Sequence, residues 1–273
     1  MYDQILYEVA DPLATITLNR PDSLNAWTFR MGVEVRHAVA QAENDPRVVV
    51  ILITGAGRGF CAGADLNDLK EISEGKTDMS TPEELEANPG DPSWGEDFRG
   101  TYTYLMSVRK PVIAAINGPV AGMALPITLA CDLRFASDRA IFTTAFARRG
   151  LIAEWGVAWL LDRLVGPAHA LDLLFSARKV EAGEAERMGL VNRVVAHDEL
   201  LDFTRTYALE LATYSSPRSM MIIKRQVYQQ LTSALGPAEK EAVQLMVESF
   251  SRPDFREGVI SFLQKRKPSF PRV

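Results

Sequence analysis

The sequence predicts an α/β fold in which strands alternate with helices, followed by a region that contains helices alone. Residues 48–54 form a continuous apolar run rich in β-branched side chains, and residues 111–118 repeat that form. Such runs are typical of strands that are covered on both faces. From Leu200 onward only helical periods remain, and prolines separate them. We therefore expect an α/β core over residues 1–199 and a helical C-terminal region over residues 200–273.

The other elements of the core are predicted from the spacing of their apolar residues. Residues 14–18 alternate apolar and polar side chains and then meet a turn, which indicates an exposed strand. Residues 28–43 space their apolar side chains three and four apart, as an amphipathic helix does. A helix rich in small residues follows the second buried strand and runs through Leu129. Three more short strands are expected, at residues 132–136, 140–142 and 191–195.

The composition is that of a globular protein. Of the 273 residues, 47% are hydrophobic and 24% are charged, which argues against a disordered or fibrous chain. The net charge of -5 argues against a protein that binds nucleic acid over its surface. We find neither a signal peptide nor an apolar run of about 18 residues, so we expect a soluble cytoplasmic protein that does not bind membranes. Cys61 and Cys131 lie in apolar or small-residue stretches, which predicts buried, reduced thiols.

Residues 72–98 form a long segment rich in acidic residues, proline, glycine and serine. The segment contains the turn sequence Asn88-Pro89-Gly90. A loop of this length inside a compact domain is usually functional, often as a lid, or else disordered. Both interpretations stay open from the sequence alone.

Two turns rich in small residues each follow a predicted buried strand, at residues 62–64 and 117–124. Glycine and alanine let a ligand approach the backbone, so amide N–H groups there could face an oxygen atom. The second turn also opens a helix, where the first N–H groups lack partners and carry a positive partial charge. Each turn could donate one hydrogen bond to a developing oxyanion. Close packing of strands against helices explains the small residues equally well.

Several short motifs occur in order along nearly the whole chain, at residues 16–21, 24–26, 59–66, 110–118, 130–132, 182–185, 189–192, 257–258 and 262–268. Together they resemble the crotonase (enoyl-CoA hydratase/isomerase) superfamily. The resemblance implies a core built as a spiral of ββα turns and a helical C-terminal region used for trimer assembly. We therefore expect a homotrimer or a dimer of trimers. The implied ligand is an acyl-coenzyme A thioester, in which coenzyme A is part of the substrate rather than a permanently bound cofactor.

The resemblance assigns roles to two backbone amides. In this family two N–H groups stabilise the thioester enolate, and they correspond here to those of Ala64 and Met123. The second position is usually glycine, so Met123 keeps the amide but adds a side chain that crowds or lines the pocket. Packing alone is the alternative role for this methionine.

Contacts to coenzyme A are also implied by the resemblance. It places Phe262 against the adenine and Lys265 in the basic segment that reaches the nucleotide, whereas a solvated basic tail is the alternative. The other implied contacts are Ala26, Ala62, Asp65 and Leu66. No metal site is expected, because the three histidines lack the spacing of metal ligands: His37, His169 and His197.

The family's hydratases use two glutamates, one to activate water and one to deliver a proton. Pro126 and Phe146 occupy the corresponding positions here, and neither can transfer a proton. Glu154 remains, and residues 142–156 resemble the Δ3,Δ2-enoyl-CoA isomerase branch, in which a single glutamate shuttles the proton. Isomerisation removes a proton at C2 and returns one at C4, so one base that becomes the acid is sufficient.

Glu154 lies in an apolar stretch beside Trp155, and poor hydration there would help the carboxyl to return its proton. A structural ion pair with Arg148 or Arg149 is the alternative role for this carboxylate. The resemblance thus implies an acyl-CoA isomerase of the kind found in fatty acid metabolism. Two other functions stay open. One is a hydratase or C–C hydrolase in which Glu154 activates water, and the other is a non-catalytic acyl-CoA-binding protein.

Overall fold

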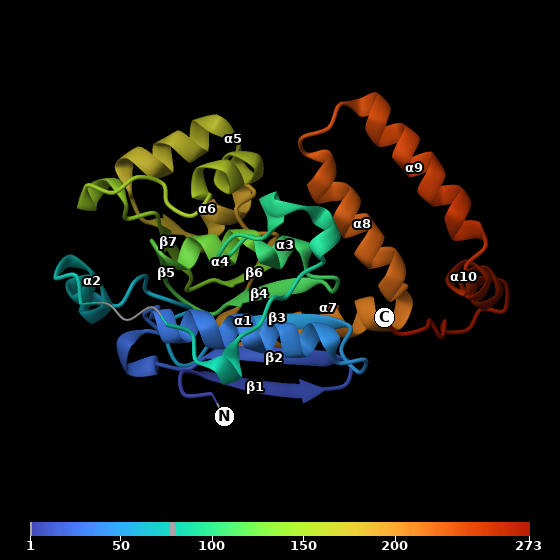
Figure 1. The fold of residues 1–273 in the computed structure, drawn as a ribbon, viewed down its shortest axis with the longest axis horizontal. Coiled ribbons are helices and arrows are strands. Elements are labelled where there is room, and N and C mark those ends of the chain that lie inside the picture. Colours follow the sequence, from blue (N-terminus) through green and yellow to red (C-terminus); the bar gives the residue numbers. More distant parts are fainter. Residues whose placement is uncertain (1, 77–79) are drawn as a thin grey trace.

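Six strands form the main sheet of the computed structural model, which describes residues 2–76 and 80–273 (Figure 1). The strand order is β1-β2-β3-β4-β6-β9; β1 and β2 are antiparallel, and the other neighbouring pairs are parallel. The α/β prediction is therefore confirmed. The strands are β1 (Ile5–Ala10), β2 (Leu13–Leu18), β3 (Val50–Gly55), β4 (Val112–Ile116), β6 (Leu133–Ser137) and β9 (Arg193–Val195).

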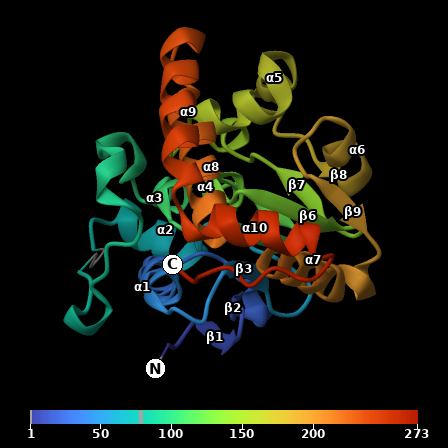
Figure 2. The same cartoon turned by 90° about the vertical axis from the view of Figure 1, so that its right-hand side faces the viewer.

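Two helices cover opposite faces of the main sheet, which explains why its central strands β3 and β4 are largely apolar (Figure 2). They are α1 (Phe29–Asn44) and α7 (Leu200–Tyr214). Successive side chains of a strand point to opposite faces. In β4, Val112 packs in the cluster that contains α1, whereas Ile113 packs in the cluster that contains α7. All residues of β4 are accordingly buried.

The predicted exposed strand at residues 14–18 is an inner strand of this sheet. It corresponds to β2, which lies between β1 and β3, and Ala14, Ile16 and Leu18 are fully buried. The prediction of exposure is wrong, because the alternation reflects two faces with unequal cover. The apolar residues face α1, and the threonines between them lie on the face that α7 covers only in part.

A smaller sheet stands beside the main one and carries the second small-residue turn. It contains a parallel pair, β5 with β7, and an antiparallel pair, β7 with β8. Helix α4 (Ala124–Ala130) follows β5, is buried along its whole length and packs on α5 (Val157–Ser176). The remaining elements of this part are β5 (Val120–Ala121), β7 (Ile141–Thr143), β8 (Val180–Glu181), α6 (Ala182–Arg187), α2 (Leu66–Ser73) and α3 (Tyr104–Ser107).

The last three helices form an arm that extends from the core on the right of Figure 1, and we call them the C-terminal arm. They are α8 (Pro217–Gln230), α9 (Leu235–Phe250) and α10 (Pro253–Leu263). Together with α7 they make the predicted helical C-terminal region. No helix in the described parts of the chain is long and apolar enough to cross a membrane.

Lys224 of α8 ties the C-terminal arm to the core. Its side chain is buried, and its Nζ lies 2.7 Å from a carboxylate oxygen of Asp132. The same nitrogen donates to the carbonyl oxygens of Leu105 at 3.0 Å and Lys110 at 3.1 Å. Asp132 also accepts from the hydroxyl of Tyr228 at 2.9 Å. The lysine thus has three oxygen partners in the core.

Replacing Lys224 by methionine is expected to lower the free energy of unfolding by about 3–5 kcal/mol, because it leaves Asp132 without its cation in a largely buried position. Urea denaturation followed by circular dichroism measures this change. Lys240 of α9 is exposed, so Lys240→Met serves as the control and should change stability by less than about 0.5 kcal/mol. Equal effects of the two substitutions would contradict this role of Lys224.

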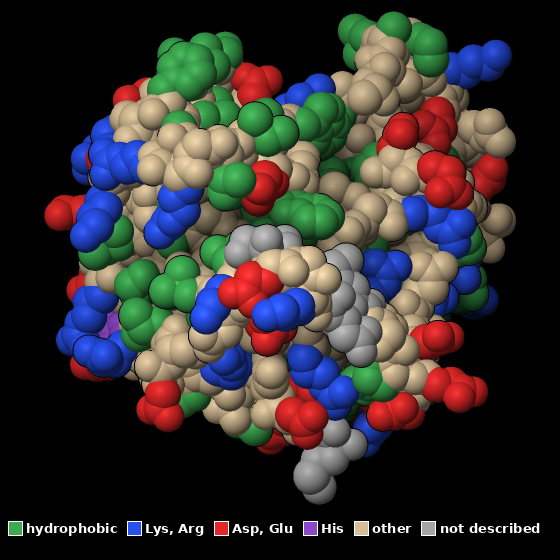
Figure 3. All heavy atoms as spheres, turned by 60° about the vertical axis from the view of Figure 1, so that its left-hand side comes forward, with side chains coloured by type: hydrophobic (Ala, Val, Ile, Leu, Met, Phe, Trp, Pro, Cys, Tyr) green, Lys and Arg blue, Asp and Glu red, His purple; other side chains and the backbone are tan. Residues whose placement is uncertain are grey.

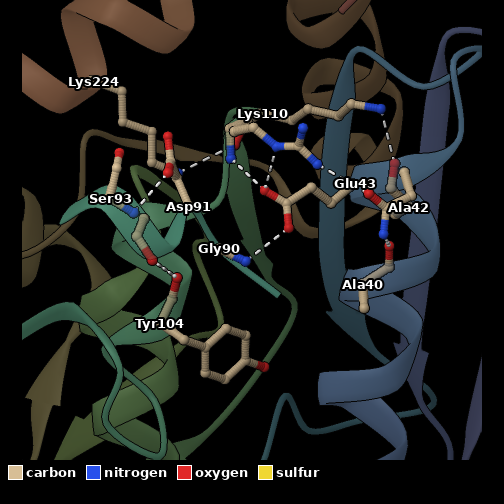
Figure 4. Close-up of polar contacts among 12 residues, drawn as sticks. Ala40, Ala42, Glu43, Gly90, Asp91, Ser93, Tyr104, Lys110 and Lys224 are labelled. Carbon is tan, nitrogen blue, oxygen red and sulfur yellow. Dashed lines mark hydrogen bonds and ion pairs between the residues drawn. The ribbon is translucent and has the colours of Figure 1, made fainter. Parts of the chain in front are cut away.

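The acidic segment packs on α1 in its described part. Arg36 donates from Nε to the carbonyl oxygen of Ala87 at 3.0 Å. Glu43 accepts from the N–H of Gly90 at 2.7 Å and from the N–H of Arg109 at 2.8 Å, so one buried carboxylate fixes this segment beside the start of β4 (Figure 4). Short 3-10 turns occur at Glu83–Leu85, Pro92–Trp94 and Glu96–Phe98. Residues 77–79 of the predicted loop lie outside the described residues.

Candidate active site

The first small-residue turn leaves the N–H of Ala64 without an acceptor in the described chain. Ala64 pairs with Trp27 in an isolated parallel bridge. The N–H of Trp27 donates to the carbonyl of Gly63 at 2.7 Å, and the N–H of Asp65 donates to the carbonyl of Trp27 at 2.9 Å. In a parallel bridge of this kind the polar groups of the central residue point away from the partner. The Ala64 amide is therefore held in place while its N–H stays available to a ligand.

The second turn also leaves a backbone N–H available to a ligand, that of Met123. Gly122 has a φ of +46°, and its N–H donates to the carbonyl of Thr143 at 3.0 Å. Met123 follows as the N-cap residue of α4, and its N–H has no acceptor in the part of the chain that the structure describes. Its side chain is half-buried and packs on the main hydrophobic cluster. The methionine thus combines a packing role with an available amide.

The structure brings the two turns together. Cys61 and Val120 pair in a parallel bridge, with the N–H of Cys61 donating to the carbonyl of Pro119 at 3.0 Å. Gly63 packs so closely on Ala121 that a Cβ at Gly63 would lie 3.0 Å from the Ala121 carbonyl oxygen. The sequence predicted each turn from local residues, and their contact places both amides in one region of the molecule.

Two buried asparagines hold the glycine-rich loop at residues 55–59, which precedes the first turn. The side-chain nitrogens of Asn25 and Asn117 both donate to the carbonyl oxygen of Gly59, at 2.8 and 3.2 Å. At Gly118 an added Cβ would lie 2.1 Å from the carbonyl oxygen of Arg58, so only glycine fits there without a backbone shift. These contacts explain physically why the asparagine and glycine motifs occur at these positions.

Glu154 lies in the turn that leads into α5, and its carbonyl oxygen accepts from the N–H of Val157 at 3.0 Å. The residue is half-buried, and its carboxylate makes no hydrogen bond or ion pair with any residue that the structure describes. Arg148 instead donates from Nε to the carbonyl of Ser176 at 2.8 Å. The alternative of a structural Glu–Arg pair is therefore not observed. Trp155, beside which poor hydration of this carboxylate was expected, is 49% exposed.

Tyr102 lies between Trp27, which pairs with Ala64, and Trp155, the neighbour of Glu154. Burial raises the pKa of the Tyr102 hydroxyl above its usual value, and the negative charge of Glu154 raises that pKa further, against a lowering by a hydrogen bond with Trp27. Such interactions require the groups to be near one another. Sequence reasoning missed both Trp27 and Tyr102. Trp27 could have been found from the sequence, because it directly follows the motif at residues 24–26. No motif points to Tyr102.

The residues predicted to contact coenzyme A separate into two groups. Ala26 and Asp65 are joined through Arg20, whose Nη1 lies 2.6 Å from the Ala26 carbonyl and 2.8 Å from the Asp65 carboxylate. Ala62 and Leu66 lie in the same turn and at the start of α2. Phe262 and Lys265 lie instead at the end of α10, on the opposite side of the molecule from α2, because the C-terminal arm points away from the site (Figure 1). Within one chain the structure does not bring the two groups together.

The carboxylate of Asp65 has internal partners. Burial alone would raise the pKa of Asp65, but hydrogen bonds from the N–H of Asn67 and from Arg20, together with the charge of Arg20, hold it below its usual value. The ion pair therefore ties the loop before Ala26 to the first turn, and any contact between coenzyme A and Asp65 has to share a carboxylate that is already bonded.

Asp65→Asn is expected to flatten the dependence of stability on pH. Because the folded pKa lies below the unfolded value of about 3.9, the contribution of Asp65 is fully present above that value and is lost as pH falls through the folded pKa. The unfolding free energies of wild type and variant should converge as urea denaturation is repeated from pH 6 down to pH 3. Asp202→Asn, on an exposed carboxylate of α7, is the control. A constant difference at all pH values would contradict this prediction.

Neither thiol of the chain is poised to react. Burial raises the pKa of Cys61 and of Cys131 to about 12, so both stay protonated near neutral pH. The prediction of buried thiols is confirmed. Among the described residues, no group of three or more His, Cys, Asp or Glu side chains is arranged to hold a metal ion.

A comparison with family models decides the family: the model of enoyl-CoA hydratase/isomerase matches residues 8–272. The chain belongs to this enoyl-CoA hydratase/isomerase (crotonase) family. A Mycobacterium bovis protein named as a probable enoyl-CoA hydratase is 33% identical over 98% of both chains. The 1,2-epoxyphenylacetyl-CoA isomerase of Escherichia coli K12 is 34% identical over 99% of both chains.

Solved structures of the enoyl-CoA hydratase/isomerase family have the same fold. An enoyl-CoA hydratase from Bacillus anthracis superposes with a TM-score of 0.86 at 26% identity, over 98% of this chain and 99% of that one. An enoyl-CoA hydratase/isomerase from Mycobacterium paratuberculosis gives a TM-score of 0.84 at 30% identity, over 99% of both chains. The names of these relatives include both hydratases and isomerases, so family membership leaves the reaction open.

The two positions that the resemblance assigns to the hydratase glutamates are apolar and buried here. Pro126 lies in the first turn of α4, where a missing N–H is tolerated because it has no helical acceptor. Phe146 is 3% exposed and belongs to the main hydrophobic cluster. No residue of α4 carries a carboxylate. The enoyl-CoA hydratase/isomerase fold is thus present, and Glu154 is the carboxylate that the resemblance assigns to acid–base chemistry.

Proposed function

We propose that this protein moves the double bond of a 3-enoyl-CoA to give the 2-enoyl-CoA, with Glu154 as the single proton carrier. One observation carries the proposal. The carboxylate of Glu154 is half-buried and free of ion pairs in the described chain, while Pro126 and Phe146 stand where a hydratase would have its acids. Among the described residues, the turn before α5 therefore supplies the one carboxylate that the resemblance assigns to proton transfer.

The proposed reaction has two proton transfers. The Glu154 carboxylate removes a proton from C2, and the electrons of that C–H bond move into the thioester carbonyl. The N–H groups of Ala64 and Met123 donate to the resulting enolate oxygen, which needs donors fixed before the charge develops. Glu154 then gives the proton to C4, so that the double bond ends between C2 and C3. No water is consumed and the carboxylate is regenerated.

The substrate surface is proposed to include exposed apolar side chains. The face in Figure 3 carries several patches of hydrophobic side chains, and the exposed apolar residues of the chain include Leu66 at the start of α2 and Ile152 and Trp155 in the loop before α5. An apolar acyl chain or the hydrophobic part of coenzyme A would cover such side chains and remove them from water. Ala26, Ala62 and Asp65 stay proposed contacts to coenzyme A, which enters as part of the substrate.

A homotrimer, or a dimer of trimers, is proposed as the assembly. Helices α9 and α10 expose large apolar residues that include Val247, Phe250 and Phe262, the last of which is 82% exposed. Exposed apolar surface of this kind is typical of interfaces between subunits. Association through the arm would also give Phe262 and Lys265 a route to the nucleotide of another copy. Light scattering of the purified protein measures the number of copies.

Incubation with 3-enoyl-CoAs of several chain lengths tests the proposed reaction. Absorbance of the conjugated thioester should rise, and a parallel reaction in oxygen-18 water should leave the acyl product unlabelled. A labelled 3-hydroxyacyl product would favour a hydratase, and a labelled carboxylate from C–C cleavage would favour a hydrolase. Binding of acyl-CoA with no turnover on any of these substrates would favour a non-catalytic binding protein.

A further inference from the structure

Tyr102 is a buried aromatic residue that touches both halves of the candidate site. It is 6% exposed and lies just before α3. Its ring stands edge-on to that of Trp27, with centroids 5.7 Å apart and an interplanar angle of 67°. It also stands edge-on to Trp155, again at 5.7 Å and with an angle of 88°. Edge-to-face contacts at such distances are attractive and directional.

Each tryptophan is linked to one of the two proposed reacting groups, Trp27 to the Ala64 amide and Trp155 to Glu154. Trp27 bonds through its backbone to the residues on either side of Ala64, so its position fixes that amide. Trp155 is the neighbour of Glu154 and has a φ of +55°. A residue other than glycine keeps such a conformation only where its surroundings hold it. The contact with Tyr102 is a packing interaction that can hold Trp155 in this conformation.

The electrostatics of Tyr102 agree with this placement. Its hydroxyl lies near enough to Glu154 for the charge of that carboxylate to raise its pKa. Because burial and the charge of Glu154 favour the protonated form, the phenol stays neutral at neutral pH and adds no charge beside the carboxylate. Its influence on the reaction is therefore expected to come from the ring.

We propose that Tyr102 is a positioning residue whose ring sets the separation between the Ala64 amide and the Glu154 carboxylate. This proposal rests on the proposed function of Glu154 as the proton carrier. Trp27, Tyr102 and Trp155 act as one aromatic bridge between the two halves of the site. Proton transfer depends steeply on such separations, because a displacement of about 1 Å can cost about 10²-fold in rate.

Three variants test the aromatic bridge. Tyr102→Leu removes the ring and should lower kcat by about 10- to 100-fold while KM changes by less than about threefold. Tyr102→Phe keeps the ring without the hydroxyl and should restore kcat to within about threefold of wild type. Tyr104→Leu is the matched control: Tyr104 is equally buried but contacts Arg36 rather than the tryptophans. It should lose stability with kcat within about threefold of wild type.

Exchange of the C2 protons of a saturated acyl-CoA in deuterated water gives a second readout. This exchange needs the Glu154 base and both amides but no shift of a double bond. It therefore distinguishes the proposed function from the proposed role of the aromatic bridge. A wild-type protein without exchange would overturn both the proposed function and the bridge. A wild type that exchanges, with equal rates in Tyr102→Leu, would overturn the bridge alone. A tenfold or greater loss in Tyr102→Leu, restored in Tyr102→Phe, would support it.

A further variant keeps the proposal testable if Tyr102→Leu does not fold. Trp155→Gly removes the other ring of the bridge, and glycine adopts a φ of +55° without strain. The backbone at Glu154 is then free to move, so the same loss in kcat and in proton exchange is expected. Wild-type exchange rates in a folded Trp155→Gly protein would overturn the proposal.

Discussion

Replacing Glu154 by glutamine is expected to lower kcat for 3-enoyl-CoA isomerisation by about 10²- to 10⁴-fold, the range that a positioned acid–base group contributes. Glutamine keeps the size of the side chain but cannot accept the C2 proton. Because the carboxylate makes no ion pair in the described chain, the substitution leaves no partner charge unpaired. Stability should therefore change by less than about 1 kcal/mol.

The control for this prediction is Asp162→Asn, on another partly exposed carboxylate of the helix that follows Glu154. Its kcat should stay within about threefold of wild type, and the rise of conjugated thioester absorbance measures all three proteins. Wild-type turnover in Glu154→Gln would exclude Glu154 as the proton carrier. Equal losses in both variants would indicate general damage to the turn before α5.

The strands that stand out most clearly in the sequence are those that are buried on both faces. β3 and β4 are buried on both faces, so their apolar runs stand out. β1 lies at the edge of the main sheet and mixes buried, half-buried and exposed residues, so Ile5–Ala10 showed no clear period. β5 and β8 contain two residues each, and no period can be recognised in two residues.

The candidate site was predictable where its requirements are local. Small residues around Ala64 and Met123 mark backbone that a ligand can approach, and an isolated carboxylate in an apolar stretch marks Glu154. The residues that join these parts were not predictable, because Trp27 and Tyr102 meet only in the folded chain. Their contact depends on how the first turn packs against the region before α3.

The predicted contacts to coenzyme A also depend on contacts between segments that are distant in the sequence. Asp65 is adjacent to the first turn in sequence, but its ion pair with Arg20 joins two distant segments and could not be read from either. The position of Phe262 and Lys265 depends on the direction of the C-terminal arm. That direction is set by contacts such as the one between Lys224 and Asp132, which again are tertiary.

Replacing Met123 by proline is expected to lower kcat by about 10²- to 10³-fold, because it removes one of the two proposed donors to the enolate. The φ of Met123 is −59°, which is close to the value that proline requires. Gly122 precedes it with a positive φ, and glycine tolerates a following proline better than residues with a Cβ. Since the N–H of Met123 has no acceptor in the described chain, the substitution breaks no internal hydrogen bond.

Met123→Ala separates the amide from the side chain, since it keeps the N–H and removes the group that packs on the core. Its kcat should exceed that of Met123→Pro by at least about tenfold, even though it loses more packing. The enolate charge develops only in the transition state, so the loss in Met123→Pro should appear in kcat rather than in KM. Equal kcat values in the two variants would mean that the Met123 amide does not bind the enolate. Ala64 would then be the one remaining proposed donor to the enolate oxygen.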